Sequence, residues 1–497
     1  MSDAAWAHVC RSMEELRALA GAVNLLSWDQ ETYMPPRGAA ARGEQLAALQ
    51  GLGHERLVDP RLGEALERAE AAPGDEERRA ALAALRFDRD RAVRVPVALV
   101  KELARSQSRG VQAWRTAREA SAFARFAPEL THLVELRREM ADALGVPPGG
   151  ERYDALLEGY EPGMRVARLE PLLRRLAGWL APLADRAASA TVEDGFLRGR
   201  FEAGAQWDFT LELLEAMGFD LQAGRQDRSA HPFSTGIDPG DVRLTTRIHE
   251  ELPLSAIFST LHEGGHGLYE QGLPERWRGS VLGAAASYGL HESQSRLWEN
   301  QVGRSLPFWR HFLPRLAARF PSLAGVPVEA FHRAANKVER TLIRVEADEV
   351  TYNLHIVLRF ELEVALLRGQ LQVADLPAAW SDRCAALLGV RPARDAEGCL
   401  QDIHWAWGEI GYFPTYTLGN LYAASLFAAA GRDLPGLEEE IGTGNLAPLL
   451  GWLREKVHRA GRTLPAEELV RRATGAGLTD EDLRRALTAK VERLCRT

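Results

Sequence analysis

Amphipathic, helix-forming stretches run through most of the sequence, and this pattern constrains the fold more than any other feature. Ala, Leu, Arg and Glu dominate, and apolar residues recur at helical spacing, as at Leu16, Leu19, Val23 and Leu26. Such spacing gives a helix one apolar stripe that packs against neighbours and one polar stripe that faces water. The sequence therefore predicts a mainly α-helical protein.

The composition is that of an ordinary globular protein. Of the 497 residues, 46% are hydrophobic and 26% charged, with a formal net charge of −8, so nothing indicates a nucleic-acid partner. Residues 1–29 lack the basic start and unbroken apolar run of a signal peptide, and no stretch has the length of a membrane span. Four cysteines without CxxC spacing indicate no disulfide framework, so we expect a cytoplasmic protein with no membrane partner.

Residues 231–250, HPFSTGIDPGDVRLTTRIHE, differ from this helical background. A DPG turn signal is followed by alternation of apolar or small residues with polar ones, at Val242, Leu244, Thr246 and Ile248. Alternation with a period of two predicts a half-buried strand. We expect a small antiparallel β-sheet here.

The segment 260–270, TLHEGGHGLYE, carries the strongest chemical signal. If residues 254–273 form a helix, His262 and His266 lie one turn apart and both imidazoles reach one cation. Glu263 lies on an adjacent face, where its carboxylate meets a metal-activated water rather than the metal. The pattern is typical of a metal-dependent hydrolase, and a helix with two surface or core-edge histidines is the alternative that the motif alone leaves open.

Catalytic zinc requires a third protein ligand and one open position. A third histidine at metzincin spacing is absent, because the chain has Tyr269 and Gly272 where that motif has glycine and histidine. A carboxylate from a second helix is the other source, and residues 288–304 offer Glu292 and Glu299. Glu292 is the better candidate because Arg296, four residues later, is placed to hold its carboxylate. We expect Glu299 to be solvated or at a packing edge.

Two adjacent glycines, Gly264 and Gly265, lie between the two histidines. Each costs a helix about 1 kcal/mol relative to alanine. We expect them to make room for a close neighbour, either a substrate backbone or a packed strand.

Six motifs in order resemble the M32 metallocarboxypeptidases, the carboxypeptidase Taq type. They are residues 231–233 (HPF), 241–247 (DVRLTTR), 262–266 (HEGGH), 291–294 (HESQ), 343–348 (IRVEAD) and 411–420 (GYFPTYTLGN). Residues 27–49, 153–164 and 451–462 also look like parts of that family, so the likeness covers nearly the whole chain. It implies a single catalytic domain over residues 1–497, with a helical region at about 1–130 forming part of a groove wall and a metal-site core at about 225–425.

The resemblance implies a fold, an activity and a metal. The fold would be two-lobed, helical and deeply grooved, similar in outline to the neurolysin and angiotensin-converting-enzyme group, and the protein would be a homodimer. The activity would be removal of single residues from the free C-termini of peptides with broad preference. The metal, held by His262, His266 and Glu292, would be zinc, or cobalt in some preparations, with Glu263 as general base. A zinc oligopeptidase that cuts inside short peptides is the alternative activity, and a helical scaffold with a dead site is the alternative from another class.

Further roles follow from the chemistry and the resemblance together. Tyr412 and Tyr416 are candidates to stabilise the oxyanion, with Tyr416 preferred and core packing as the alternative. Arg344 is the candidate for the substrate carboxylate, because the family links its motif to C-terminal recognition and a guanidinium pairs well with a carboxylate.

A second group of residues is expected around the substrate. Arg243 and Asp241 are candidates to close the end of the groove, with a structural ion pair as the alternative. His231 and His404 are candidate pocket residues, although a lone histidine is more often structural.

Overall fold

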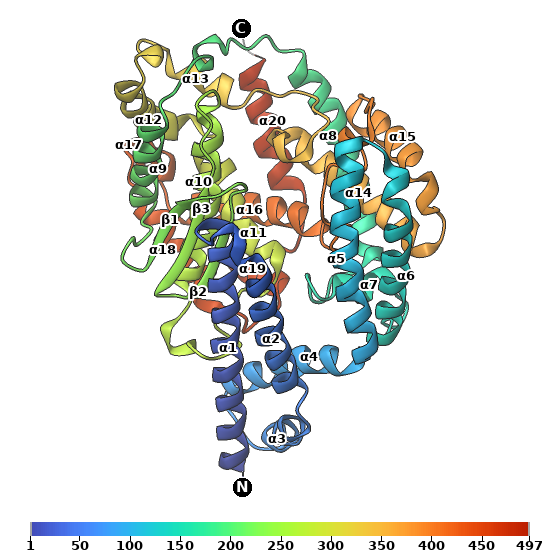
Figure 1. Ribbon diagram of the computed structural model, residues 1–497. Helices are drawn as coiled ribbons and strands as arrows, with labels where there is room; N and C mark the ends of the chain where they lie inside the picture. Colours follow the sequence, from blue (N-terminus) through green and yellow to red (C-terminus); the bar gives the residue numbers. More distant parts are fainter. Residues whose placement is uncertain (1, 496–497) are drawn as a thin grey trace.

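The computed structural model describes residues 2–495, and helices account for most of them (Figure 1). The helices of the N-terminal half are α1 (Ser2–Thr32), α2 (Ala39–Val58), α3 (Pro60–Glu70), α4 (Glu76–Arg94), α5 (Val97–Ala120), α6 (Ala127–Leu144), α7 (Arg152–Leu157), α8 (Val166–Ala188) and α9 (Ala203–Met217). Those of the C-terminal half are α10 (Pro253–Gly272), α11 (Tyr288–Arg296), α12 (Leu306–Arg319), α13 (Val328–Ala335), α14 (Glu349–Arg368), α15 (Leu376–Leu388), α16 (Pro414–Asp433), α17 (Leu437–Thr443), α18 (Ala447–Lys456), α19 (Ala466–Thr474) and α20 (Glu481–Leu494). The mainly α-helical class predicted from the sequence is confirmed.

The helices form two sides joined by a central layer. In Figure 1, α9, α10, α12 and the sheet lie on one side, α5–α8, α14 and α15 lie on the other, and α11 and α16 lie between them. One apolar core runs through both sides, and its fully buried members include Trp298 and Trp309. This arrangement agrees with the two lobes expected from the sequence, whereas the deep groove and the likeness to neurolysin stay predictions.

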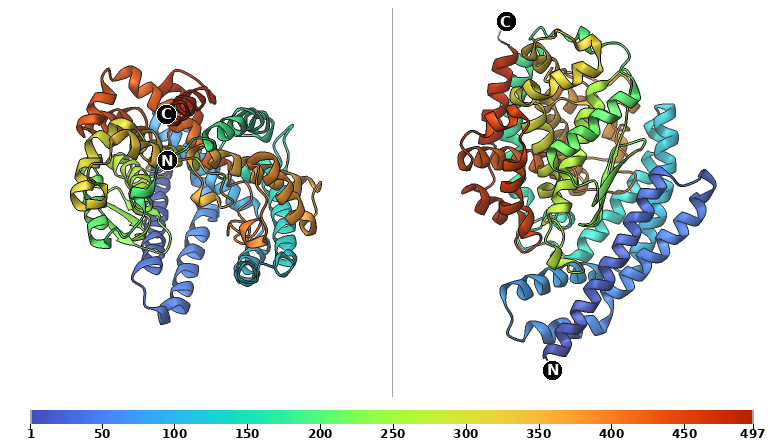
Figure 2. Two further views of the ribbon diagram at one scale, coloured as in Figure 1. Left: turned by 90° about the horizontal axis from the view of Figure 1, so that it is seen from above. Right: turned by 90° about the vertical axis from the view of Figure 1, so that its left-hand side faces the viewer.

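The N-terminal helices have an apolar core of their own. Figure 2 shows α1 and α2 as a pair that projects beyond the rest of the molecule. Val9 and Met13 of α1 are buried against α3, α4 and the segment around Trp277. The helical positions singled out in the sequence, such as Leu16 and Leu19, are only partly buried, because α1 packs along part of its length. Whether this region forms a groove wall stays a prediction.

The predicted sheet exists but is mixed rather than antiparallel. It has three strands, β1 (Gly224–Arg228), β2 (Ser234–Asp238) and β3 (Asp241–Thr246), in the order β1-β3-β2. The hairpin β2–β3 is antiparallel, as expected, with Gly236 opposite Val242. The chain reverses twice between β1 and β3, so these two strands run parallel. The polar sequence of β1, GRQDR, lacks the alternation by which β3 was found.

The predicted burial within β3 is largely correct. Val242, Leu244 and Thr246 are buried, whereas Ile248 lies beyond the end of the strand. Thr245 is buried as well, and its hydroxyl accepts a hydrogen bond from the backbone of Phe233 at 2.9 Å. The sheet packs beside α10 and so supports the helix that carries the histidine pair.

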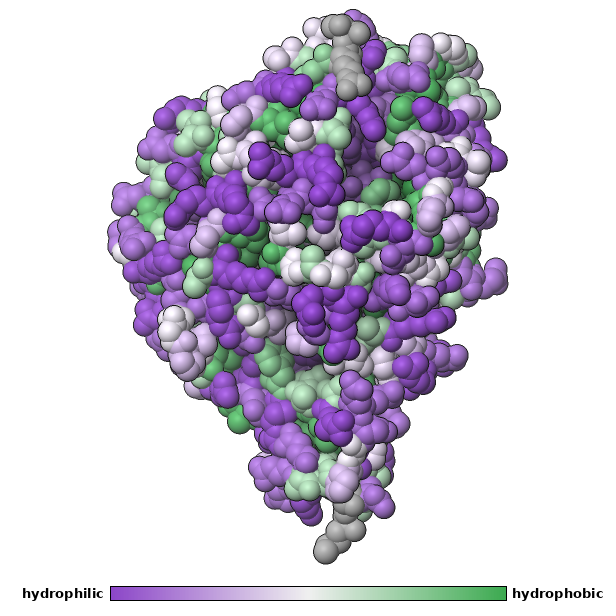
Figure 3. Space-filling model, turned by 180° about the vertical axis from the view of Figure 1, so that it is seen from behind, coloured by the Kyte–Doolittle hydropathy of each residue, from purple (hydrophilic) through white to green (hydrophobic). Residues whose placement is uncertain are grey.

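Within residues 2–495, no helix combines the length and apolar character needed to cross a membrane. The face in Figure 3 is mostly hydrophilic, with apolar side chains in small groups.

Candidate metal centre

The helix α10 presents both histidines of the HExxH motif to the protein interior. Its first residue is Pro253, a favourable position for proline because the first helical N–H has no partner within the helix. The rings of His262 and His266 have centroids 5.0 Å apart, one turn along the helix. Both side chains are mostly buried, at 18% and 14% exposure, so the helix orients them toward a common interior point.

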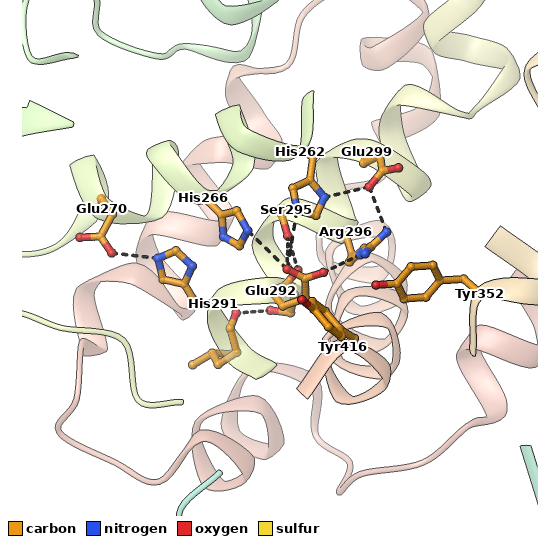
Figure 4. A network of polar contacts seen from close by, with 12 residues as sticks. His262, His266, Glu270, His291, Glu292, Ser295, Arg296, Glu299, Tyr352 and Tyr416 are labelled. Carbon is orange, nitrogen blue, oxygen red and sulfur yellow. Dashed lines mark hydrogen bonds and ion pairs between the residues drawn. The ribbon is translucent and has the colours of Figure 1, made fainter. Parts of the chain in front are cut away.

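The helix α11 supplies the carboxylate that meets them. It begins after Ser287, whose hydroxyl accepts the Leu290 N–H at 3.0 Å and so caps the helix. Glu292 Oε2 lies 3.7 Å from His262 Nε2 and 3.3 Å from His266 Nε2 (Figure 4). One ligand atom from each of these three residues falls within 4.8 Å of the others. The structure thus brings together the three residues predicted to bind the metal.

Gly264 and Gly265 let other parts of the protein approach α10 closely, as predicted. The predicted neighbour, a substrate backbone or a strand, was wrong. A Cβ at Gly265 would lie 2.5 Å from the carbonyl oxygen of Gln294 and 2.7 Å from the Cα of Ser295, both in α11. A Cβ at Gly264 would meet side chains of α9, including Leu214 at 2.9 Å. Neighbouring helices, rather than a strand, therefore fill the space that the glycines leave.

A third glycine presses on α11 from its other side. A Cβ at Gly419 in α16 would lie 2.5 Å from Cγ and 2.7 Å from Cβ of Glu292. The backbone of α11 is thus held between Gly265 and Gly419, and the Glu292 side chain has one way to extend, toward the histidines. The pattern of the sequence gave no reason to assign Gly419 this position.

Glu299 is not the solvated or packing-edge residue expected from the sequence. Its side chain is only 12% exposed, and Oε2 accepts a hydrogen bond from His262 Nδ1 at 2.9 Å. It also pairs with Arg296 at 3.2 Å and Arg304 at 3.5 Å. A π-helical turn over Leu297–Gly303 follows α11 and places this carboxylate behind His262. The seven-residue spacing from Glu292, two helical turns, was the signal that both carboxylates face the histidines.

Arg296 ties the two carboxylates together. Its Nε donates to Glu292 Oε1 at 2.7 Å, the contact that the four-residue spacing predicted, and its Nη1 donates to Glu299 Oε2 at 3.2 Å. Burial alone raises the pKa of Glu292, but the charges of Arg296 and His262 outweigh burial and hold it well below its usual range. Glu292 is therefore a carboxylate at neutral pH.

The donor set suits a divalent cation. His262 donates its Nδ1 proton to Glu299, so the lone pair of the neutral ring lies on Nε2, which faces Glu292 Oε2 across 3.7 Å. Glu292 and Glu299 raise the pKa of His262 although the ring is buried, so a cation at this point would take the place of a proton. Burial and the nearby His291 lower the pKa of His266 to about 3, so that ring is neutral at pH 7. Two imidazole nitrogens and a carboxylate oxygen converge here, which is the ligand set of a catalytic zinc site.

A second histidine and carboxylate lie behind His266. The ring of His291 stacks on His266 with centroids 4.5 Å apart, and its Nε2 lies 2.8 Å from Glu270 Oε1. Glu270 follows His266 by four residues on α10, and His291 directly precedes Glu292. This pair was missed from the sequence, although the four-residue spacing on one helix face was a usable signal.

Aromatic side chains, among them Tyr412 and Tyr416, lie beside His262, His266 and Glu292, the three residues called the metal trio below. Figure 4 shows Tyr416 beside Glu292, and Tyr416 lies one turn before Gly419 on α16. Its hydroxyl lies 3.2 Å from His404 Nε2, and its ring centroid lies 5.3 Å from that of Tyr412. Burial raises the pKa of both tyrosines above the usual phenol value, so both remain protonated donors at neutral pH.

Arg344 lies next to this aromatic group within a charged network. Its Nη2 donates to Asp402 Oδ1 at 2.8 Å, its Nη1 donates to the hydroxyl of Tyr352 at 2.9 Å, and it is 5% exposed. The guanidinium carbon lies 5.0 Å from the Tyr416 ring centroid. Tyr352 also packs under Arg296, with the guanidinium carbon 4.3 Å from its ring centroid, and so joins this network to the metal centre. Asp402 was not singled out in the sequence.

Comparison of this chain with known proteins shows the family to which it belongs. The pattern of the carboxypeptidase Taq (M32) metallopeptidases matches residues 8–491. Thermostable carboxypeptidase 1 of Thermus thermophilus is 46% identical over 486 residues, which cover 95% of each chain. The chain belongs to the M32 metallopeptidase family. The resemblance found in the six motifs is confirmed.

Solved M32 structures share the fold over almost the whole chain. The M32 carboxypeptidase from Deinococcus radiodurans is 39% identical, with a TM-score of 0.97 and 99% of each chain covered. Metallocarboxypeptidase 1 of Trypanosoma cruzi is 33% identical, with a TM-score of 0.94, covering 98% of this chain and 99% of that chain.

Three residues predicted near the substrate of this M32 chain lie in or beside the sheet. Arg243 and Asp241 of β3 pair with each other through a bidentate contact, and the Arg243 guanidinium lies 4.6 Å from the Trp28 ring centroid. Both thus form the ion pair that was the plain structural alternative, and a part in closing the groove stays a prediction. His231 is exposed ahead of β2 and forms no side-chain hydrogen bond or ion pair within residues 2–495.

Proposed function

We propose that this protein is a zinc-dependent metallocarboxypeptidase that releases C-terminal amino acids from peptides with broad specificity. The observation that carries the proposal is the convergence of His262, His266 and Glu292 beside the buried Glu263, in a chain that belongs to the M32 family. The named carboxypeptidases among its relatives support the same activity.

Zinc fits the three residues best, with cobalt as an alternative, because both accept two imidazoles and one carboxylate. The ion supplies Lewis acidity toward a water molecule and the scissile carbonyl. Glu299 and Arg296 keep the ligands oriented, since Glu299 accepts the Nδ1 proton of His262 and Arg296 holds the second oxygen of Glu292.

Glu263 is the proposed general base. It is 6% exposed, and its side chain forms no hydrogen bond or ion pair with any residue in the range 2–495, so the carboxylate is free to take a proton. Burial raises its pKa to about 7, which matches a group that both accepts and returns protons near neutral pH. It would accept the proton of the attacking water and pass it to the leaving amine.

Tyr416 is the proposed donor to the oxyanion, with Tyr412 as the alternative. Its protonated phenol lies beside Glu292, and His404 holds the hydroxyl from one side. A preorganised donor of this kind is worth about 3–4 kcal/mol to the transition state.

Arg344 is the proposed partner of the substrate carboxylate. A guanidinium has five N–H donors, of which Asp402 and Tyr352 engage three, so one N–H on each Nη group remains. Asp402 fixes the plane of the fork, which favours a second carboxylate in that plane. His404, His231, Arg243 and Asp241 are proposed to line the remainder of the substrate site.

The proposed base is tested by Glu263→Gln. This variant is expected to bind Zn²⁺ as the wild type does, and its kcat is expected to fall by about 10²–10⁴-fold because no group takes the proton. Zinc content and peptide hydrolysis are measured together, with the exposed Glu329→Gln as the control. Hydrolysis at the wild-type rate would remove Glu263 from the reaction.

Paired substrates test the exopeptidase part. A peptide with a free C-terminal carboxylate is expected to yield a ladder of single-residue losses by mass spectrometry, and the same peptide as its C-terminal amide is expected to be stable. Equal cleavage of both would favour the oligopeptidase alternative. Arg344→Met is expected to raise KM for the free acid, with Asp402 still paired to Arg359 at 2.5 Å.

Three properties complete the proposal. We propose that residues 1–497 act as one catalytic domain, that the protein is cytoplasmic, and that it is a homodimer. The shared core of the two sides supports the first of these.

A further inference from the structure

A cavity outside the metal trio is lined by residues of α4, α5, α6 and α7. These four helices lie on the same side of the molecule in Figure 1. Its volume is about 330 Å³, within the range of sites that take small organic ligands. His54 of α2 reaches it, and Tyr160 and two arginines line its polar part. Its apolar wall consists of Val95, Val100, Met140, Leu144, Leu156 and Ile410.

Arg137 lines this cavity, and its guanidinium group donates no hydrogen bond to an oxygen atom of the described chain. The one hydrogen bond of its side chain runs from Nη1 to the sulfur of Met140 at 3.0 Å, and a thioether is a weak acceptor. The Nε–H is out of contact with solvent and has no partner. A guanidinium does not deprotonate in a protein, so the charge stays when the side chain is buried.

Arg91 adds a second charge to the same wall. Its Nη1 and Nη2 both donate to the backbone oxygen of Ala155 at 3.2 Å, and neither Arg91 nor Arg137 forms an ion pair with a carboxylate in the described chain. The fully buried Arg344 and Arg359, by contrast, both pair with Asp402.

No carboxylate near this cavity forms an ion pair with Arg137 or Arg91 in the described chain. Glu158 pairs with Arg165, and Asp88 pairs with Arg462 at 2.6 Å. Glu409 faces Arg137 without forming an ion pair, and burial raises the pKa of Glu409 to about 7. Two partly exposed guanidinium groups therefore line a largely apolar cavity, and neither pairs with a carboxylate of the described chain.

We propose that this cavity binds a small aliphatic carboxylate, whose head group pairs with Arg137 and Arg91 and whose chain lies against the apolar wall. Two guanidiniums recognise a carboxylate with several charge-assisted hydrogen bonds, and the surrounding Val, Leu, Met and Ile side chains exclude a strongly hydrated inorganic anion. No lining residue belongs to the metal trio, so binding in this cavity is a separate event from metal binding and can be measured without the metal.

The site also touches the aromatic group beside the metal centre. Tyr160 lines the cavity, and its ring centroid lies 5.3 Å from that of Tyr412 and 5.6 Å from that of Tyr288. A ligand in the cavity would therefore contact Tyr160, which in turn packs against Tyr412.

Direct binding tests the proposal. Isothermal titration calorimetry of the full-length protein with 4-methylpentanoate is expected to give binding at least tenfold tighter than with 4-methylpentanamide or inorganic phosphate. The affinity is expected to be the same with and without Zn²⁺. Equal affinity for the acid and the amide, equal affinity for phosphate, or binding that needs Zn²⁺ would overturn the proposal.

Substitutions locate the binding. Arg137→Met keeps the aliphatic stem, removes the charge and is expected to weaken binding of 4-methylpentanoate at least tenfold. Arg138→Met is the matched control, because Arg138 is the next residue of α6 and donates instead to the Leu366 carbonyl, away from the cavity. Arg91→Met provides an independent second variant, and circular dichroism checks that each variant is folded. Wild-type affinity in the folded Arg137 and Arg91 variants would overturn the proposal, whatever the outcome for peptide hydrolysis.

Discussion

The metal centre and the region around Tyr160 differ in how their charged side chains are paired. At the metal centre, Glu292 and Glu299 share Arg296, so each buried charge has an opposite charge within hydrogen-bonding distance. Around Tyr160, the buried Glu161 has no cationic partner in the described chain, and the partly exposed Arg137 of α6 has no carboxylate paired with it. The two regions adjoin, because Glu161 accepts a hydrogen bond from the backbone of Gly289 in α11 and the ring of Tyr160 packs on that of Tyr412.

The comparison shows that an acidic side chain and an arginine respond differently when no opposite charge lies beside them. An acid removes its own charge by taking a proton, and burial raises the pKa of Glu161 to about 8. An arginine has no such option, so Arg137 keeps its charge. The metal centre thus gathers acceptors that suit a cation, whereas the cavity between α6 and α7 gathers donors that suit an anion.

The largest effect is expected for Glu161→Gln. Between pH 4.5 and 8 the unfolded chain ionises Glu161 while the folded chain keeps it protonated, so the wild-type free energy of unfolding falls by about 1.4 kcal/mol per pH unit. The amide resembles the neutral acid and avoids this loss. Relative to wild type, the variant is expected to gain about 3–5 kcal/mol between pH 4.5 and pH 9.

Urea unfolding at a series of pH values measures this gain. The exposed Glu119→Gln serves as the control and is expected to follow the wild-type profile. Parallel profiles for Glu161→Gln and wild type would show that Glu161 is ionised in the folded protein, and the contrast with Arg137 would then be lost.

Gly419→Ala is expected to have the next largest effect. The new methyl group would overlap Cβ and Cγ of Glu292, so α11 or the carboxylate must shift. Overpacking of this kind costs about 1–3 kcal/mol, and we expect Zn²⁺ affinity to fall by up to about a hundredfold. Competition with a chromogenic chelator measures the affinity.

The control is Gly431→Ala in the same helix, where a Cβ has nothing within 4 Å. It is expected to bind Zn²⁺ as the wild type does. Unchanged affinity in Gly419→Ala would mean that α11 moves aside without disturbing the ligands.

Glu299→Gln is expected to have the smallest effect of the three. The amide oxygen still accepts the Nδ1 proton of His262, but the ion pairs with Arg296 and Arg304 are lost. Removal of such a supporting carboxylate typically weakens metal binding by about 10–100-fold. The same chelator competition measures it, and an unchanged dissociation constant would mean that Arg296 alone orients the site.

Local spacing accounts for the parts of the site that the sequence predicted. His262, Glu263 and His266 belong to one helix, whose 3.6-residue period already sets their relative directions. Spacing also suggested Glu292, since Arg296 follows it by one turn, and the structure shows that contact. Glu299 was misjudged because a charged residue two turns along a helix is as often solvated as buried, and only the fold of the π-helical turn distinguishes the two cases.

The sheet gives the same lesson. Alternation revealed β3, whose Val242 and Leu244 enter the core, but β1 is polar and was invisible. Its parallel pairing with β3 depends on where the chain returns, which no local pattern records.

By itself, the sequence determined the helical class, the histidine pair with its adjacent glutamate and, through six ordered motifs, the family. Those features follow from short-range periodicity and residue chemistry, which a single segment contains. Only the tertiary structure decided that Gly265 and Gly419 hold α11 against the histidines, that Glu299 supports His262, and that Arg137 has no counter-ion. Each of these depends on contacts between segments far apart in the chain, and burial there determines whether a charge is paired, neutralised or left to a ligand.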